Sequence, residues 1–230
     1  SANRAARVIA VSDFTKCELI TNFGLPPEQV SVIWSGVNPP LPRETVSPQP
    51  LILYVGSIFN RRHIPELIRA FARVSRRIPA AQLVLVGDNR SHPYQDPIQL
   101  ANAAGVKDRV TVKSYIPEAE LTALYSQAMV FVFLSEYEGF GLPPLEAMAA
   151  GVPTVVGDTP VARELYLSAS RLVAVHDIPA IANHLTTLIE DPQARVSLLK
   201  ASTALIDRFS WHRAASKTLA LLEQAGSNRW

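Results

Sequence analysis

Two glutamates flank a glycine-rich turn in the segment from Ser135 to Gly151, SEYEGFGLPPLEAMAAG. Glu138 lies just before the Gly-Phe-Gly turn, and Glu146 lies in the apolar run that follows it. Carboxylates accept hydrogen bonds from hydroxyl groups, often two at once, so this pair is suited to binding ribose and hexose. The alternative is that Glu146 only complements a helix dipole and that Glu138 is a solvated loop residue.

A strand and a helix must position this turn. Val130–Leu134 has the length and the β-branched or aromatic content of a buried parallel strand. Pro143 and Pro144 suit the first turn of a helix, and Gly151 suits the residue just after its end. The resulting strand, turn and helix place backbone N–H groups and a positive dipole end at the carboxyl edge of a sheet. Open α/β sheets bind anionic ligands at that edge.

A basic pair, Arg61-Arg62, is the second chemical signal. It follows the predicted strand Leu51–Val55 and the turn Gly56-Ser57, at the edge of the sheet where a diphosphate would lie. A guanidinium group can bind phosphate oxygens with two parallel hydrogen bonds. The alternative is a pair of solvated arginines just before a helix.

Strands and helices alternate from Leu51 onward. Such alternation favours an α/β fold, with a Rossmann-like parallel sheet flanked by helices and joined by right-handed crossovers. The predicted strands are short apolar runs: Val8–Val11, Val30–Trp34, Leu51–Val55, Leu83–Val86, Val110–Lys113, Val130–Leu134 and Thr154–Val156.

Apolar residues also recur at helical spacing. Ser12 is suited to cap a helix over Asp13–Phe23, because its hydroxyl can accept a hydrogen bond from a first-turn N–H. The final third of the chain is predicted to be helical. The other predicted helical faces are Ile64, Leu67, Ile68, Phe71 and Val74; Leu121, Leu124, Tyr125 and Ala128; Ile178, Ile181, Ala182, Leu185, Leu188 and Ile189; and Trp211, Ala214, Ala215, Leu219 and Leu222.

The composition is that of an ordinary globular protein, with 48% hydrophobic and 18% charged residues. The net charge of +2 and the lack of long runs of like charge predict no nucleic-acid partner. Cys17, the single cysteine, lies among apolar residues and is expected to be a small buried hydrophobe. No apolar run approaches the roughly 18 residues of a spanning helix, and no signal peptide opens the chain. We therefore expect a cytoplasmic protein that attaches to the inner face of a membrane at most peripherally.

The histidines predict no metal site. His63 is expected in a surface loop near the basic pair, and the other histidines are scattered without the spacing of metal ligands. No Asp-x-Asp occurs, so metal-dependent binding of a nucleotide sugar has no support in the sequence. The turn Gly139–Pro144 has proline where a dinucleotide-binding fingerprint has its third glycine, which argues against NAD.

The segment from Glu138 to Glu146 resembles the E-x7-E signature of the retaining GT-B glycosyltransferases of family four, and the match continues to Glu164. Three further stretches are similar to the same family: LILYVGSIFNRRHIPELIRAFARV (51–74), LVLVGD (83–88) and YIPEAELTALYSQAMVFVFLS (115–135). RVIAVSDFTKCELITNFGLPPEQVSVIWSGV (7–37) is similar to the segment before that family's interdomain linker. The resemblance covers most of the chain in the family's order and is specific for the family, but it says little about the substrate.

The resemblance implies one domain with a fragment of another attached. Residues 51–208 resemble the nucleotide-sugar-binding C-terminal half of a GT-B fold, and residues 1–37 resemble a remnant of the N-terminal acceptor domain. Residues 38–50 are expected to form a Pro-rich linker, and residues 209–230 a helix that crosses back toward the remnant. We therefore expect that most of the N-terminal domain is missing, by truncation or naturally, and that this chain alone is inactive.

The resemblance also implies roles around the glycine-rich turn. Glu146 would bind ribose hydroxyls, and Glu138 would be a catalytic residue that binds a hexose hydroxyl. The backbone amides of Phe140, Gly141 and Leu142 would orient the sugar and the diphosphate.

Arg62 stands where the family usually has lysine, so the resemblance implies that it stabilises the leaving diphosphate as a second catalytic residue. The family usually has an arginine directly after Gly56, whereas this chain has Ser57. Arg61 would be a spare cation in the same donor site, and Ile116 would contact the nucleobase.

The activity that the resemblance implies is transfer of a hexose from a nucleoside-diphosphate sugar to an acceptor sugar or lipid. It implies retention of anomeric configuration by same-face attack, with no metal and no cofactor. The choice among GDP, UDP and ADP is not readable, although the RRH turn after Gly56 favours GDP-mannose. The alternatives are a non-catalytic nucleotide-binding module and a GT-B epimerase or phosphorylase, and the E-x7-E segment argues against the last two.

Overall fold

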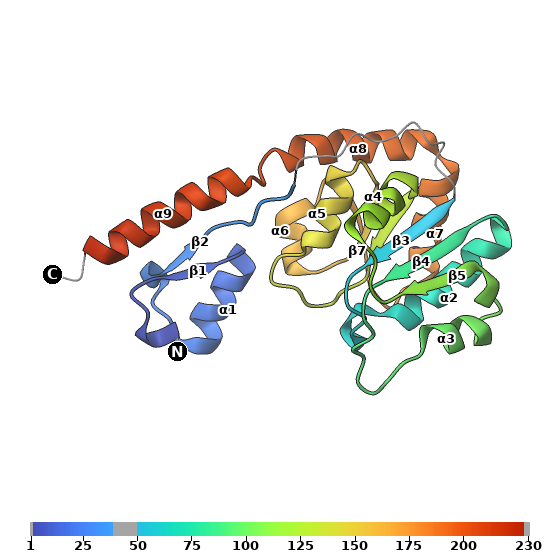
Figure 1. Ribbon diagram of the computed structural model, residues 1–230, viewed down its shortest axis with the longest axis horizontal. Coiled ribbons are helices and arrows are strands. Elements are labelled where there is room, and N and C mark those ends of the chain that lie inside the picture. Colours follow the sequence, from blue (N-terminus) through green and yellow to red (C-terminus); the bar gives the residue numbers. More distant parts are fainter. Residues whose placement is uncertain (1, 39–49, 228–230) are drawn as a thin grey trace.

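A six-stranded parallel sheet forms the centre of the structure, a computed structural model that describes residues 2–38 and 50–227 (Figure 1). Its strand order is β5-β4-β3-β6-β7-β8. The chain adds strands on one side of β3 and then returns to add the rest on the other side. The order therefore reverses between β3 and β6, as in a Rossmann-like fold, which confirms the predicted α/β class. The strands are β3 (Leu51–Val55), β4 (Gln82–Val86), β5 (Val110–Lys113), β6 (Val130–Phe133), β7 (Thr154–Gly157) and β8 (Ser170–Val173).

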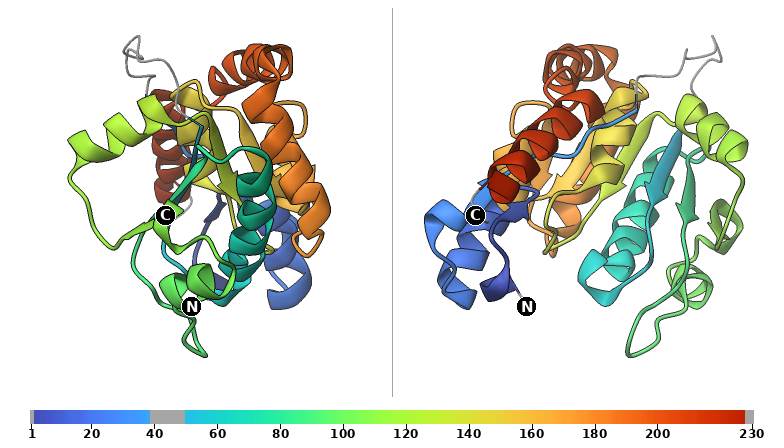
Figure 2. Two further views of the ribbon diagram at one scale, coloured as in Figure 1. Left: turned by 90° about the vertical axis from the view of Figure 1, so that its right-hand side faces the viewer. Right: turned by 60° about the vertical axis from the view of Figure 1, so that its left-hand side comes forward.

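Helices cover both faces of this sheet. α2 packs against α3 and α7 on one face, and α4 lies on the opposite face (Figure 2). The helices are α2 (Ile64–Arg77), α3 (Pro97–Ala103), α4 (Glu118–Gln127), α5 (Leu142–Ala149), α6 (Pro160–Tyr166), α7 (Ile178–Glu190) and α8 (Pro192–Ile206), with 3-10 turns η3 (Asn60–Arg62) and η4 (Lys107–Arg109). The strand β8 and the short helices α3 and α6 lie outside the predicted elements.

The core lies between the two helical layers and the central strands. Because β3 and β6 are covered on both faces, nearly all of their side chains are buried, including Ile52, Leu53 and Phe131. The predicted apolar face of α2 is confirmed, since each of its five members is at most 1% exposed. The periodicity of this helix therefore identified the layer that packs on the sheet.

The N-terminal segment forms a small separate unit. A two-stranded parallel sheet pairs Val8 with Val30, and its strands end somewhat earlier than the sequence predicts. The elements are η1 (Ala2–Arg4), β1 (Val8–Ala10), α1 (Asp13–Phe23), η2 (Pro27–Gln29) and β2 (Val30–Val32). Ser12 caps α1 as predicted, because its hydroxyl oxygen accepts from the backbone N–H of Thr15 at 3.0 Å.

The predicted burial of Cys17 is wrong, because this cysteine is exposed. The helix α1 contains no fully buried residue, since the two-stranded sheet and α6 contact only part of its surface. Apolar neighbours in the sequence therefore did not place this side chain in a core.

The last helix, α9 (Trp211–Ser227), extends alongside the N-terminal unit (Figure 1). Its start packs against the end of that unit, where the rings of Trp34 and Phe209 lie 5.4 Å apart. A side chain on Gly36 would collide with the backbone of Trp211, at 2.2 Å, so glycine permits this approach. Leu219 and Leu222, further along α9, are exposed.

Of the predicted Pro-rich linker, residues 38–50, the stretch 39–49 lies outside the described residues. Among the helices of the described ranges, none combines the length and the apolar character needed to span a bilayer.

Candidate functional site

The two chemical signals of the sequence meet at one place on the sheet. Gly56 follows the carboxyl end of β3, and the segment 135–141 follows the carboxyl end of β6. These strands are neighbours at the point where the strand order reverses. In open α/β sheets the crevice outside the strand ends at such a point is the usual ligand site.

Arg62 and Glu138 face each other directly at this point. The Nη2 and Nε atoms of Arg62 lie 3.0 and 3.1 Å from Oε1 of Glu138. Both side chains are mostly buried, with 11% and 18% of their surfaces exposed. Ser135 donates a further hydrogen bond from its hydroxyl to the same carboxylate at 2.9 Å. The sequence placed both residues at this edge, but it did not predict that they form an ion pair.

Glycine at position 56 makes room for Arg62. A Cβ atom on Gly56 would lie 2.5 Å from Nη1 of Arg62, and the φ of this glycine is 143°. The same Nη1 donates to the carbonyl oxygen of Ser57 at 2.8 Å. The guanidinium also lies 4.9 Å from the centre of the Phe133 ring. These contacts hold Arg62 against the end of β3.

Arg61 occupies a more open position. Its side chain is 37% exposed, and its Nη2 lies 4.0 Å from Glu138. Its Nε donates to the carbonyl oxygen of Tyr137 at 3.2 Å, and its guanidinium lies over the ring of Phe59. Arg61 therefore lies beside the Arg62–Glu138 pair, and Arg62 makes the shorter contact with Glu138.

The helix α5 begins directly after the glycine-rich turn. Gly141 is its N-cap in the left-handed region at a φ of 97°, and no side chain caps this terminus. A Cβ atom on Gly141 would lie 2.5 Å from the hydroxyl of Tyr166. The first N–H groups of a helix have no partner within the helix and can bind an anion. In α5, Pro143 and Pro144 have no N–H, so the amides available at this end are those of Phe140, Gly141 and Leu142. Phe140 and Leu142 flank this cap.

Tyr166 packs against the glycine-rich turn. Its hydroxyl donates to the carbonyl oxygen of Phe140 at 3.4 Å. Burial raises the pKa of Tyr166 above its ordinary value, and the nearby carboxylate of Glu138 raises it further. Tyr166 is therefore a neutral hydrogen-bond donor beneath the N-terminus of α5.

Glu146 lies inside α5, whereas Glu138 lies before it, so the two glutamates do not share a continuous helical face. Glu146 is exposed, and the hydroxyl of Tyr125 lies 3.5 Å from its Oε2. Neighbouring atoms exclude water from part of this carboxyl group, which raises its pKa, while the Tyr125 hydroxyl acts in the opposite direction. Solvent access limits the size of this shift.

The proposed nucleobase contact lies farther out in the sheet. Ile116 is half-buried after β5, which β4 separates from β3. Its neighbour Tyr115 is 88% exposed. Residues 114–117 form a loop without helix or strand, which leaves the Tyr115 ring in solvent.

The N-terminal unit touches the glycine-rich turn, which the sequence did not predict. The hydroxyls of Ser12 and Thr15 donate to the carbonyl oxygen of Gly139 at 2.6 and 3.1 Å. The Tyr137 hydroxyl donates to Oε2 of Glu18 at 3.0 Å. Ser12 and Thr15 look in the sequence like ordinary helix-capping residues, so their contact with a distant loop has no local signal.

Glu164 of α6 provides a second contact with the N-terminal unit. Its two carboxylate oxygens accept from the backbone N–H groups of Asp13 and Phe14, each at 2.9 Å. These groups belong to the first turn of α1, where a negative charge also complements the helix dipole. Glu164 therefore completes the capping that Ser12 begins.

The variant Glu164→Ala is expected to destabilise α1 by about 1 kcal/mol, because two first-turn N–H groups lose their acceptor. Amide hydrogen exchange of residues 13–16 should quicken, while exchange in β3 and β6 stays unchanged. Unchanged exchange in α1 would contradict the capping role of this carboxylate.

The expectation that His63 is a surface-loop residue is wrong. His63 is 7% exposed and has a left-handed backbone, with a φ of 51°, at the start of α2. Its Nε2 lies 2.9 Å from Oε2 of Glu136. Its ring meets that of His176 edge to face, 4.6 Å between centres. The packing of α2 against α7 brings together two histidines that are scattered in the sequence.

Comparison with known families identifies the chain. The family described as "Glycosyl transferases group 1" matches residues 42–204. The chain belongs to this family. The family described as "Glycosyltransferase Family 4" matches residues 1–40 of the same chain. The resemblance of the chain to this family is thus confirmed.

Curated relatives of the chain include mannosyltransferases. It is 26% identical over 233 residues to O-antigen chain mannosyltransferase B of Escherichia coli, which covers 95% of the chain and 61% of the relative. It is 29% identical over 231 residues to MMP alpha-(1->4)-mannosyltransferase of Mycolicibacterium hassiacum, covering 97% of the chain and 55% of the relative. The chain thus spans little more than half the length of these relatives.

A solved structure supports the fold of the chain. The Anabaena protein HepE in complex with UDP-glucose superposes with a TM-score of 0.83 at 23% identity. The match covers 97% of this chain and 65% of that one. At this identity the likeness is one of fold.

Proposed function

We propose that this chain is the donor-binding part of a retaining, metal-independent hexosyltransferase that uses a nucleoside-diphosphate sugar. The observation that supports this most is the Arg62–Glu138 pair beside the uncapped N-terminus of α5. One cation, one carboxylate and the first N–H groups of a helix lie where the strand order reverses. Together they match a ligand that has an anionic diphosphate at one end and sugar hydroxyls at the other.

Arg62 takes the role of phosphate ligand. Without a ligand its guanidinium is neutralised by Glu138, and a diphosphate would compete with that carboxylate for the same donors. Once on the phosphate, the guanidinium stabilises the negative charge that grows as the glycosidic bond to the diphosphate breaks. The positive end of α5 adds to this stabilisation, so the charge of the leaving group is balanced without a metal ion.

Glu138 takes the role of sugar ligand. Its carboxylate is released when Arg62 turns to the phosphate, and it can then accept hydrogen bonds from hexose hydroxyls. The amides of Phe140, Gly141 and Leu142 orient the sugar relative to the diphosphate. A sugar held on one face by these groups can be attacked by the acceptor on the side that the phosphate leaves, with retention of configuration.

Fewer residues are assigned to the nucleoside part of the donor. Glu146 binds ribose hydroxyls, and Ile116 contacts the base from the loop after β5. Arg61 serves as a second, more exposed cation near the diphosphate. The mannosyltransferase relatives favour a mannosyl donor, and we propose GDP-mannose.

Calorimetric titration with GDP-mannose, GDP, UDP-glucose, UDP and ADP tests this proposal. GDP and GDP-mannose should bind at one site with the lowest dissociation constants, and UDP-glucose should bind more weakly. Product analysis with the full-length protein separates an enzyme from a non-catalytic nucleotide-binding module. A chain that binds none of these nucleotides would contradict a donor-binding role.

The variant Glu146→Gln is expected to raise the dissociation constant of the nucleotide about tenfold, a loss of about 1.4 kcal/mol. The amide keeps the size of the side chain but loses the charge that strengthens hydrogen bonds from ribose. Thermal melting should change little, because Glu146 is exposed. The control Glu28→Gln makes the same charge change in the exposed turn η2 and should bind as the native chain does.

Affinity of the native chain should also fall at low pH. The pKa of Glu146 is raised, mainly by partial burial, so its carboxylate is lost at a higher pH than an ordinary glutamate would lose it. Nucleotide binding should therefore weaken as the pH falls through this raised pKa, and Glu146→Gln should remove that part of the pH dependence. If nucleotide affinity depends on pH in the same way in the native chain and in Glu146→Gln, Glu146 does not bind the nucleotide and only complements the helix dipole.

A further inference from the structure

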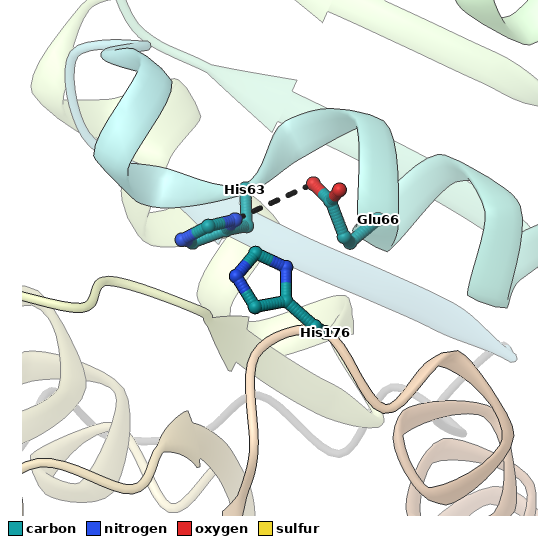
Figure 3. Close-up of side chains that lie close together, drawn as sticks. All are labelled: His63, Glu66 and His176. Carbon is teal, nitrogen blue, oxygen red and sulfur yellow. Dashed lines mark ion pairs between the residues drawn. The ribbon is translucent and has the colours of Figure 1, made fainter.

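Three side chains that can bind a metal converge next to the candidate donor site (Figure 3). His63 begins α2, Glu66 lies in the first turn of the same helix, and His176 comes from the loop between β8 and α7. One potential ligand atom from each residue lies within 4.8 Å of the others. The cluster joins two elements that are far apart in the sequence.

Each ring nitrogen of His63 faces a carboxylate group. Its Nε2 lies 2.9 Å from Oε2 of Glu136, and a carboxylate at that distance takes the N–H of the ring. Its Nδ1 faces Oε2 of Glu66 at 3.5 Å. A cation placed between these two atoms would be bound by both of them.

The surroundings match those of a metal ligand set. A histidine that binds a metal usually donates its other N–H to a carboxylate, as His63 does to Glu136. The second oxygen of Glu66 is held in turn, with Nη1 of Arg69 3.5 Å from Oε1. These outer contacts orient Nδ1 and Oε2 toward the same point.

The distances and the types of donor point to zinc. Bonds of about 2.0–2.1 Å place neighbouring ligands of a tetrahedral zinc ion about 3.4 Å apart. Nδ1 of His63 and Oε2 of Glu66 have this separation already, and His176, exposed in a loop, has to move closer. Two imidazoles with one carboxylate favour zinc over magnesium or calcium, which prefer oxygen ligands.

We propose that His63, Glu66 and His176 bind one zinc ion. The ion ties the start of α2 to the loop before α7. It takes no part in sugar transfer. Because His63 directly follows Arg62, the ion also fixes the backbone from which Arg62 reaches Glu138, so it is a structural clamp beside the donor site.

Zinc titration of the metal-free chain, without any nucleotide, tests the site. Calorimetry with Zn²⁺ should give one ion per chain, and Co²⁺ as a spectroscopic probe should develop visible absorption bands upon binding. Thermal melting of the native chain should shift upward with Zn²⁺. These measurements do not depend on the proposed transferase function.

Two variants locate the ion. His176→Asn and Glu66→Gln should each weaken Zn²⁺ binding at least tenfold and abolish the upward shift in melting. His176 is exposed, so its replacement should leave the fold intact, whereas a substitution of buried His63 could unfold the chain. The matched control His212→Asn removes an exposed histidine of α9 and should bind zinc as the native chain does.

The proposal is overturned if Zn²⁺ does not saturate the native chain at one ion. It is also overturned if His176→Asn and Glu66→Gln bind zinc as tightly as the native chain does. Either result would mean that His63, Glu66 and His176 only pack against one another.

Discussion

The variant Glu138→Ala is expected to lose sugar transfer by at least about 100-fold in the full-length protein, while free nucleoside diphosphate binds as tightly as before or more tightly. Without a ligand, Glu138 neutralises Arg62. Its removal frees the guanidinium for the diphosphate and at the same time removes the acceptor of the hexose hydroxyls. Loss of sugar contacts and gain of phosphate contacts should thus appear in one variant.

Titration of Glu138→Ala with GDP and with GDP-mannose measures both effects. The ratio of the two dissociation constants should change in favour of free GDP, and product analysis should detect the lost transfer. If binding of free GDP weakens as much as binding of GDP-mannose does, Glu138 acts on the diphosphate. The proposed division of roles between Glu138 and Arg62 is then wrong.

The variant Arg62→Ala is expected to weaken GDP and GDP-mannose alike, by about 10- to 100-fold, because both contain the diphosphate. This corresponds to the loss of a charged hydrogen bond, about 1.5–3 kcal/mol. The substitution also leaves Glu138 without its cation in a mostly buried position, which should lower the free energy of unfolding. Affinity and stability should therefore both fall.

Arg76→Ala provides the matched control for charge, since Arg76 is exposed at the far end of the helix that follows Arg62. It should change the dissociation constants of GDP and GDP-mannose by no more than about twofold, a few tenths of a kcal/mol. Circular dichroism and urea unfolding separate lost binding from lost folding. A native affinity for GDP in folded Arg62→Ala would exclude Arg62 as a phosphate ligand.

The positions of the site segments were predictable because they depend on local patterns. The apolar run before Ser135 could only be a buried strand, and Pro143 and Gly151 fix the start and end of the helix that follows. Parallel strands place such turns at one edge, so Gly56 and the glycine-rich turn had to lie at the same edge of the sheet. The missed strand β8 lies at an edge of the sheet, where exposed Arg171 interrupts the apolar pattern.

The side-chain pairs were not predictable, because they depend on packing between distant elements. The ion pair of Arg62 and Glu138 requires β3 to lie beside β6, a contact that no local pattern specifies. Likewise, His63 meets His176 only because α2 packs on α7. A single sequence reports which residues share a helical face, and it says little about which faces touch.

The bonds from Ser12 and Thr15 to the carbonyl oxygen of Gly139 have a mechanical consequence. The segment that contains Glu138 is anchored at one end by β6 and restrained near its middle by α1. A hinge rotation of the N-terminal unit relative to the large sheet must either break these bonds or drag the segment with it. A rotation that keeps these bonds intact would therefore displace Glu138, which directly precedes the restrained residue Gly139.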